Sequence, residues 1–169
     1  MLLFVYKRFF CCFFLNSTGT AIIRPPGHHA SSDTPAGFCF FNNIAIAARY
    51  AIKNYGLKRV LILDWDVHHG DGTQEIVKDD PNILFVSLHR FDNATFYPEK
   101  SESNFNIAKN IINIPWSGGP MSDKEYLAAF FNVILPCAYN FNPQLVLISA
   151  GFDAAKGNVG LCFSFCLIF

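Results

Sequence analysis

The chain has 169 residues, enough for one domain, and its formal net charge is +0 because 13 Lys and Arg match 13 Asp and Glu. This balance argues against a broad basic surface for nucleic acid. Hydrophobic residues make up 51% and charged residues 15%, which is apolar for a free-standing domain. The 6 cysteines show no C-x-x-C pair or regular spacing, which argues against a disulfide framework or a Cys-rich zinc site and favours reduced thiols in an intracellular protein.

The two ends of the chain differ from its middle. Residues 1–19 and 158–169 are apolar, rich in Phe and without helical or strand periodicity. Both are too short for a membrane span of about 20 residues, and Lys7 and Arg8 interrupt the first; a signal peptide remains its alternative reading. We therefore expect an N-terminal tail at 1–19, an informative domain at 20–157 and a C-terminal tail at 158–169.

The first predicted strand, Ala21 to Ile23, ends at the turn-forming segment Arg24 to Gly27, and His28 and His29 follow. Four of the 5 histidines form two adjacent pairs, each after a strand-and-turn signal. An isolated histidine is more often an ordinary surface or core residue. The paired arrangement favours a catalytic role.

A helix is predicted next. Gly37 allows a close backbone approach, and Phe38 beside it is either a core residue or a pocket wall. Asn42 or Asn43 caps a helix that ends at Gly56. Its predicted buried face consists of Ile44, Ala47, Ala48, Ala51 and Tyr55.

The apolar run Val60 to Leu63 predicts a parallel strand that is buried on both faces. Three carboxylates and two imidazoles follow between Asp64 and Asp71, and a buried strand tolerates such a cluster only where a cation or catalysis compensates it. Asp66 and His68 are two residues apart, so they project from the same side of an extended chain. This spacing lets them bind one metal ion.

A short helix is expected over Thr73 to Val77 and a buried strand over Ile83 to Leu88. The polar, Asn-rich segment Phe91 to Ile111 predicts a long surface loop. Within it, Phe96 to Pro98 is either an aromatic wall or a set of exposed loop residues.

The segment Ser122 to Glu125 is a capping box for a helix that Pro136 kinks. The helix is expected to bury Tyr126, Phe130, Val133 and Ile134. A third buried strand, Leu145 to Ile148, leads to Asp153. Because parallel strands deliver their carboxyl ends to one edge of a sheet, Asp153 is the expected third metal ligand.

Two carboxylates and one imidazole leave coordination positions open, as in a catalytic zinc site, with iron or manganese as alternatives. The histidine pair supplies a base and an acid, and Asp64 and Asp71 are carboxylates that orient the rings. The alternative is that these aspartates only cap strands and form turns.

The motifs RPPGHHA, GFCFFNNIAIAA, LDWDVHHGDGTQ, VSLHR, FYP, IPWSGGPMSDKEYLAAF and LVLISAGFDAA resemble the zinc-dependent histone deacetylases, most closely their class II branch. The resemblance implies an α/β fold with a largely parallel sheet flanked by helices, as part of the arginase/deacetylase architecture. It implies zinc at Asp66, His68 and Asp153. It also makes His29 the general base and His28 an electrostatic partner, with Asp64 and Asp71 as their respective carboxylates.

The resemblance also implies a substrate-binding set. Phe38 and Tyr97 match the aromatic pair of an acetyl-lysine tunnel, and Gly37 and Gly151 match positions beside the substrate. A structural potassium ion is implied at Asp64, Asp66, His68, Ser87 and Leu88.

The implied function is hydrolysis of the acetyl amide of N6-acetyl-lysine in histone tails or cytoplasmic proteins. It would serve chromatin regulation and transcription repression in the nucleus, the cytoplasm or both, with corepressor complexes as partners and no direct nucleic acid. The family's Gly-Gly-Tyr segment, which polarises the substrate carbonyl, has no match in this sequence, and Asn158 stands where the family usually has an acidic residue. We therefore expect a partial catalytic domain, and the alternatives are an inactive binding module and an acetylpolyamine amidohydrolase.

Overall fold

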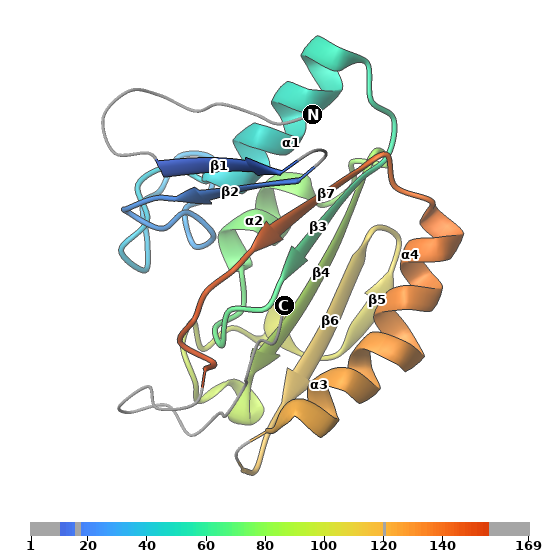
Figure 1. The fold of residues 1–169 in the computed structure, drawn as a ribbon. Coiled ribbons are helices and arrows are strands. Elements are labelled where there is room, and N and C mark those ends of the chain that lie inside the picture. The colour runs from blue at the N-terminus through green and yellow to red at the C-terminus, as the bar shows by residue number, and fades with distance from the viewer. Residues whose placement is uncertain (1–10, 16–17, 120, 156–169) are drawn as a thin grey trace.

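The computed structural model describes residues 11–15, 18–119 and 121–155. Its main feature is a five-stranded sheet in the order β5-β6-β4-β3-β7 (Figure 1). The strand β3 pairs in parallel with both β4 and β7, β6 pairs in parallel with β4, and β5 runs antiparallel to β6. The predicted α/β fold with a largely parallel sheet is therefore confirmed. The strands are β3 (Val60–Asp64), β4 (Ile83–Arg90), β5 (Asn106–Ala108), β6 (Ile111–Trp116) and β7 (Leu145–Ser149).

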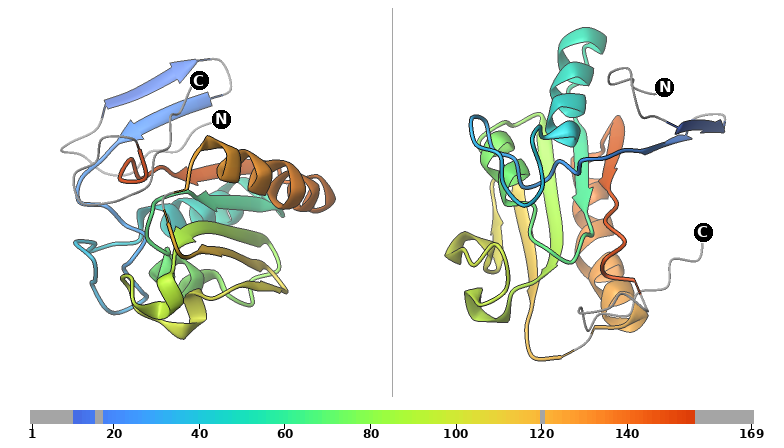
Figure 2. Two further views of the ribbon diagram at one scale, coloured as in Figure 1. Left: turned by 90° about the horizontal axis from the view of Figure 1, so that it is seen from below. Right: turned by 90° about the vertical axis from the view of Figure 1, so that its left-hand side faces the viewer.

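Helices cover both faces of the sheet (Figure 2). Successive residues of β3 point to opposite faces, so the strand contributes side chains to the core on each side. Val60 and Ile62 pack toward α1 (Asn43–Tyr55) and α2 (Asp71–Val77). Leu61 and Leu63 pack toward α3 (Asp123–Ala129) and the turns that follow it. All of β3 is buried, which explains its continuous apolar sequence.

The helix α1 has the predicted ends. The Asn42 side chain accepts a hydrogen bond from the Ala45 N–H, and Gly56 closes the helix with a φ of 67°. Its buried face differs in part from the predicted one, because Ala45 is buried beside Ala48 and Ala51, whereas Tyr55 is exposed. The ring of Tyr55 instead contacts that of Tyr50 on the outer side of the helix.

The capping box at Ser122 is present, and α3 leads through a π-helical turn, Phe130–Ile134, into α4 (Leu135–Phe141). Pro136 lies in the first turn of α4, so the expected irregularity takes the form of a wide turn just before the proline. Tyr126 and Ile134 are buried, and Phe130 and Val133 are half-buried against the same core.

The segment Phe91 to Ile111 is more structured than expected. It contains two 3-10 turns, Asp92–Ala94 (η1) and Ser101–Ser103 (η2), and the strand β5. The strand β6 follows where no strand was predicted. Its sequence includes Asn113, which is fully buried because its amide donates to Gln74 Oε1 and to the Glu102 carbonyl.

The strand β7, at one edge of the main sheet, was expected to be buried, but its side chains alternate. Leu145 and Leu147 pack against the core, whereas Val146 and Ile148 on the opposite face are exposed. A separate antiparallel pair consists of β1 (Cys11–Leu15) and β2 (Thr18–Ile22). The first of these strands lies in a segment whose sequence shows no strand periodicity. In the part of the chain that the structure describes, no helix combines the length and apolar character needed to cross a membrane.

Candidate active site

The polar cluster lies where the parallel strands end. Asp64, the last residue of β3, is the register partner of Ser87 on β4 and of Ser149 on β7. The loops that follow β3 and β7 therefore leave the same edge of the sheet side by side. This edge brings together polar side chains that are far apart in the sequence.

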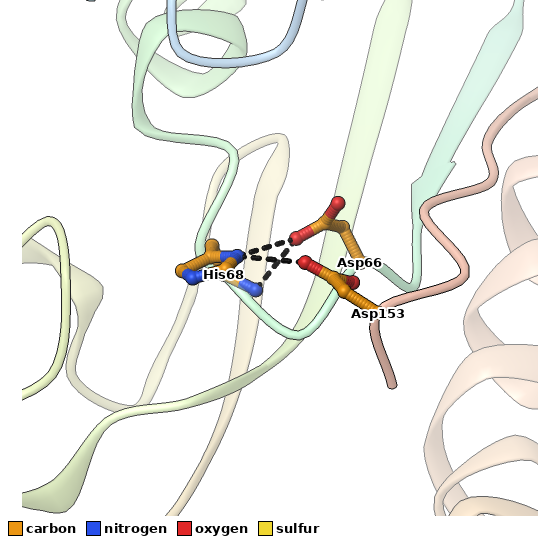
Figure 3. Close-up of side chains that lie close together, drawn as sticks. All are labelled: Asp66, His68 and Asp153. Carbon is orange, nitrogen blue, oxygen red and sulfur yellow. Dashed lines mark hydrogen bonds and ion pairs between the residues drawn. The ribbon is translucent and has the colours of Figure 1, made fainter. Parts of the chain in front are cut away.

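Asp66, His68 and Asp153 converge at this edge (Figure 3). Nδ1 of His68 lies 3.0 Å from Asp66 Oδ1 and 2.9 Å from Asp153 Oδ2. One potential ligand atom from each residue lies within 4.8 Å of the other two. The structure thus groups the three residues that were expected to hold zinc.

The sequence suggested that an extended chain brings Asp66 and His68 together, but the backbone at these residues is not extended. The strand ends at Asp64, and the chain bends at residues 66–68. The bend is held by backbone N–H groups that donate to carboxylates: Asp66 N to Asp64 Oδ1, and His68 N to Asp66 Oδ1. Asp153 Oδ1 accepts from Val67 N at 3.0 Å, which ties the β7 loop to the same bend.

The chemistry of this triad suits a divalent metal. Burial acts to lower the pKa of His68, but its hydrogen bonds to Asp153 and Asp66 outweigh that effect and raise the pKa to about 9. The two carboxylates therefore attract a positive charge to Nδ1. Two oxygens and one nitrogen from three half-buried residues form a set that fits zinc and leaves coordination positions for water and substrate.

Two histidine–aspartate pairs adjoin the triad. His28 Nδ1 lies 2.9 Å from Asp64 Oδ2, and His29 Nδ1 lies 2.6 Å from Asp71 Oδ1. Both histidines are 5% exposed, and their ring centroids are 4.0 Å apart. Both pairings match the expectation from the sequence.

The two rings differ in their tendency to carry a proton. Burial acts to lower the pKa of His28, but the charge and hydrogen bond of Asp64 outweigh it and raise the pKa to about 9. For His29, burial and the positive charge of His28 lower the pKa despite the hydrogen bond to Asp71. These opposite shifts favour a proton on His28 and the neutral form of His29. A neutral His29 that donates from Nδ1 to Asp71 has a basic Nε2.

Two glycines allow these groups to approach the backbone closely. A Cβ added to Gly37 would lie 2.3 Å from His29 Cδ2, and one added to Gly151 would lie 1.9 Å from Asp66 Oδ2. Any side chain at either position would displace a residue of the site.

Aromatic side chains surround the site unevenly. The Tyr97 ring lies 4.9 Å from that of His29, whereas Phe38 is 90% exposed and has a φ of 64°. Phe38 is therefore not a core residue. Phe96, which the sequence marked only as a candidate wall, stacks on His68 with ring centroids 5.0 Å apart and has the Arg90 guanidinium 4.5 Å from its centroid.

Lys100 is a neighbour of the site that sequence reasoning missed. Its Nζ lies 2.6 Å from Asp71 Oδ2, on the opposite carboxylate oxygen from His29. Lys100 occurs in a polar segment without periodicity or motif, so no signal in the sequence pointed to it.

The remaining expected positions lie deeper. Ser87 and Leu88 are fully buried on β4, and Ser87 Oγ lies 2.8 Å from His89 Nδ1. Asp64 and Ser87 are neighbours across the β3–β4 pair.

A largely parallel sheet that presents a candidate metal-ligand triad beside two histidine–aspartate pairs is an arrangement suited to metal-assisted hydrolysis. The family model of the histone deacetylase domain matches residues 14–162, and the chain belongs to this family.

The chain is similar to several characterised proteins. It is 51% identical over 146 residues to polyamine deacetylase HDAC10 of Danio rerio and 54% identical over 140 residues to histone deacetylase 6 of Caenorhabditis elegans. These matches cover 83% and 79% of this chain but 22% and 15% of the relatives. The crystal structure of the HDA15 HD domain superposes with a TM-score of 0.78 at 46% identity, covering 85% of this chain and 42% of that one.

Proposed function

We propose that this site hydrolyses the acetyl amide of N6-acetyl-lysine in proteins, with zinc held by Asp66, His68 and Asp153. The observation that carries the proposal is the pair of buried histidines beside the triad, each with Nδ1 within hydrogen-bond distance of an aspartate. Amide hydrolysis needs both a base for water and an acid for the leaving amine. The family and the named activities of its members support the substrate class.

Each group of the site has a distinct role in amide hydrolysis. A zinc ion held by Asp66, His68 and Asp153 would supply a Lewis acid for the acetyl carbonyl and the attacking water. His29 Nε2 takes a proton from that water as its oxygen bonds to the carbonyl carbon. When the carbon–nitrogen bond breaks, His29 returns the proton to the departing lysine nitrogen, and the proton of the new carboxylic acid also passes to that amine. The products are acetate and the ammonium form of lysine.

Asp71 keeps the Nδ1 proton on His29, so the Nε2 atom stays available as the base. His28, held by Asp64, contributes positive charge next to the developing oxyanion. Tyr97 packs its ring against His29 and is suited to contact the apolar lysine chain. Gly37 and Gly151 keep space open beside the reacting groups.

The decisive experiment is turnover of an acetyl-lysine peptide by the purified, zinc-loaded chain, with the His29→Ala variant as the blank. We expect His29→Ala to retain zinc and to lose about 10²- to 10⁴-fold in kcat. The exposed substitution Lys109→Met, at an ion pair with Asp79, is the matched control and should keep full activity. Zinc-loaded, folded chain with no turnover above the blank would overturn the enzymatic proposal and favour a binding module.

A second candidate substrate class is acetylated polyamines, favoured by the 51% identity to a protein named a polyamine deacetylase. Comparison of kcat/KM for an acetyl-lysine peptide and for an N-acetylated polyamine separates the two. A ratio of kcat/KM that favours the polyamine by tenfold or more would replace the lysine proposal.

Three further proposals rest on the family alone. They are a potassium ion at Asp64, Asp66, His68, Ser87 and Leu88, residence in the nucleus or cytoplasm, and association with corepressor complexes. Dependence of thermal stability on potassium rather than sodium tests the ion, and imaging and co-purification from cells test the other two.

A further inference from the structure

Each carboxylate oxygen of Asp71 contacts a different nitrogen. Oδ1 faces His29 Nδ1 at 2.6 Å, and Oδ2 faces Lys100 Nζ at 2.6 Å. The Asp71 side chain is only 7% exposed, whereas that of Lys100 is 50% exposed. The carboxylate that orients His29 therefore also binds a cation that reaches in from the surface.

The backbone next to Lys100 is firmly anchored. Lys100 precedes the η2 turn, whose last residue, Ser103, is buried. Ser103 Oγ lies 2.7 Å from His69 Nδ1, and the Ser103 carbonyl accepts from His89 Nε2 at 2.7 Å. On the other side of Lys100, Tyr97 packs on His29. Although its own side chain is half-exposed, Lys100 thus extends from a segment that is fixed on both sides.

A carboxylate held at only one oxygen turns easily, because the terminal torsion of Asp is broad. Charge-assisted hydrogen bonds at both oxygens restrict that rotation. A fixed Asp71 in turn fixes the orientation of the His29 ring and the nitrogen that carries its proton. An ordinary exposed Lys–Asp pair contributes little, but here one partner is buried and belongs to the site.

We propose that Lys100 is a positioning residue for His29, with its ammonium group holding Asp71 in the orientation that keeps the His29–Asp71 hydrogen bond short. The inference deepens the proposed function, since it concerns the base of the same site. It predicts a defect in the orientation of one histidine without loss of the fold or of the zinc ligands.

Proton NMR of the histidine ring N–H groups tests this without requiring turnover. Spectra are recorded on the full chain with and without zinc, and the His29 Nδ1 proton is assigned from its absence in His29→Ala. In Lys100→Met, which keeps the alkyl chain and removes the charge, we expect this resonance to move upfield or to broaden by exchange. Lys100→Arg should restore it, and Lys109→Met should not affect it. The His28 Nδ1 proton, bonded to Asp64, is the internal reference and should stay unchanged.

The second readout is kinetic. With an acetyl-lysine peptide, Lys100→Met should lower kcat by about tenfold and leave KM and zinc content unchanged, with recovery in Lys100→Arg. An unchanged His29 resonance in Lys100→Met would overturn the proposal, as would equal loss of the His28 and His29 signals. If the wild-type chain shows no turnover but the His29 resonance responds as expected, the positioning role stands and only the enzymatic proposal fails.

Discussion

Nδ1 of His68 lies 2.9 Å from Oδ2 of Asp153, and this contact joins the bend after β3 to the segment after β7. It exists because β7 pairs with β3, although β4, β5, β6 and three α-helices separate them in the chain. Asp153 also accepts from Val67 N, so the two segments are linked through both carboxylate oxygens. The order of strands in the sheet therefore determines whether the triad can form.

Removal of a single side chain of the triad should abolish zinc binding. In Asp66→Ala or His68→Ala, two remaining ligands cannot hold the ion against water, and zinc content measured after dialysis should fall from one equivalent to near zero. The control Asp79→Ala removes an exposed carboxylate that pairs with Lys109 and should keep zinc. Retention of one equivalent in both triad variants would contradict the assignment of the site.

Gly151→Ala should weaken zinc binding by displacing a ligand. The added Cβ would lie 1.9 Å from Asp66 Oδ2, so the carboxylate must move. A loss of about 10- to 100-fold in zinc affinity is expected by competition with a chelating dye. In Gly118→Ala the added Cβ meets nothing within 4 Å, although φ is +89°, so that variant should lose some stability and no zinc affinity. Equal zinc affinities in the two variants would refute the steric argument.

Stability at acidic pH should depend on Asp71. Burial acts to raise the pKa of Asp71, but hydrogen bonds from His29 and Lys100 outweigh it and lower the pKa from its ordinary 3.8 to about 2. A lowered pKa means that the ionised group stabilises the folded state above about pH 4, and that this stability is lost as the pH falls toward about 2. The free energy of unfolding, measured with urea between about pH 5 and about pH 2, should decrease more steeply in wild type than in Asp71→Asn. Parallel curves would show that Asp71 carries no such linkage.

Ser103→Ala should destabilise the chain more than the same substitution at the exposed Ser101. The substitution leaves His69 Nδ1 buried without its hydroxyl donor, at a cost of about 1 to 3 kcal/mol in the free energy of unfolding. Ser101→Ala removes a hydroxyl whose bond to Glu102 is exposed, and should change stability by less than about 0.5 kcal/mol. Urea unfolding of both variants provides the measurement, and similar values for the two would contradict the importance of the buried bond.

The strands β3 and β4 could be predicted because apolar runs are typical of strands buried in a parallel sheet. The strand β6 could not, because Asn113 interrupts its apolar pattern. Asn113 is buried only because Gln74 and Glu102, from other elements, supply acceptors for its amide. A side chain whose partners come from distant segments gives no local signal.

In the site, too, some residues could be predicted from the sequence and others could not. Asp153 could be placed from its position after a strand, because parallel strands deliver their carboxyl ends to one edge of the sheet. Asp66 and His68 were grouped correctly, but from an extended spacing that the structure replaces with a bend after β3. Lys100 could not, since its contact with Asp71 depends on how a polar loop folds back across the sheet edge. Phe38 illustrates an open alternative that only the structure resolves, since its exposure rules out core packing.

The central position of β3 has a consequence for the time at which the site can form. His68 emerges from the ribosome well before Asp153, but the triad needs β7 to dock on β3. Contacts between segments so distant in the chain form late, because closing a long loop costs entropy before any contact repays it. Zinc capture therefore reports that β7 has docked on β3, and a nascent chain that stops short of β7 would carry both histidine–aspartate pairs without a metal centre.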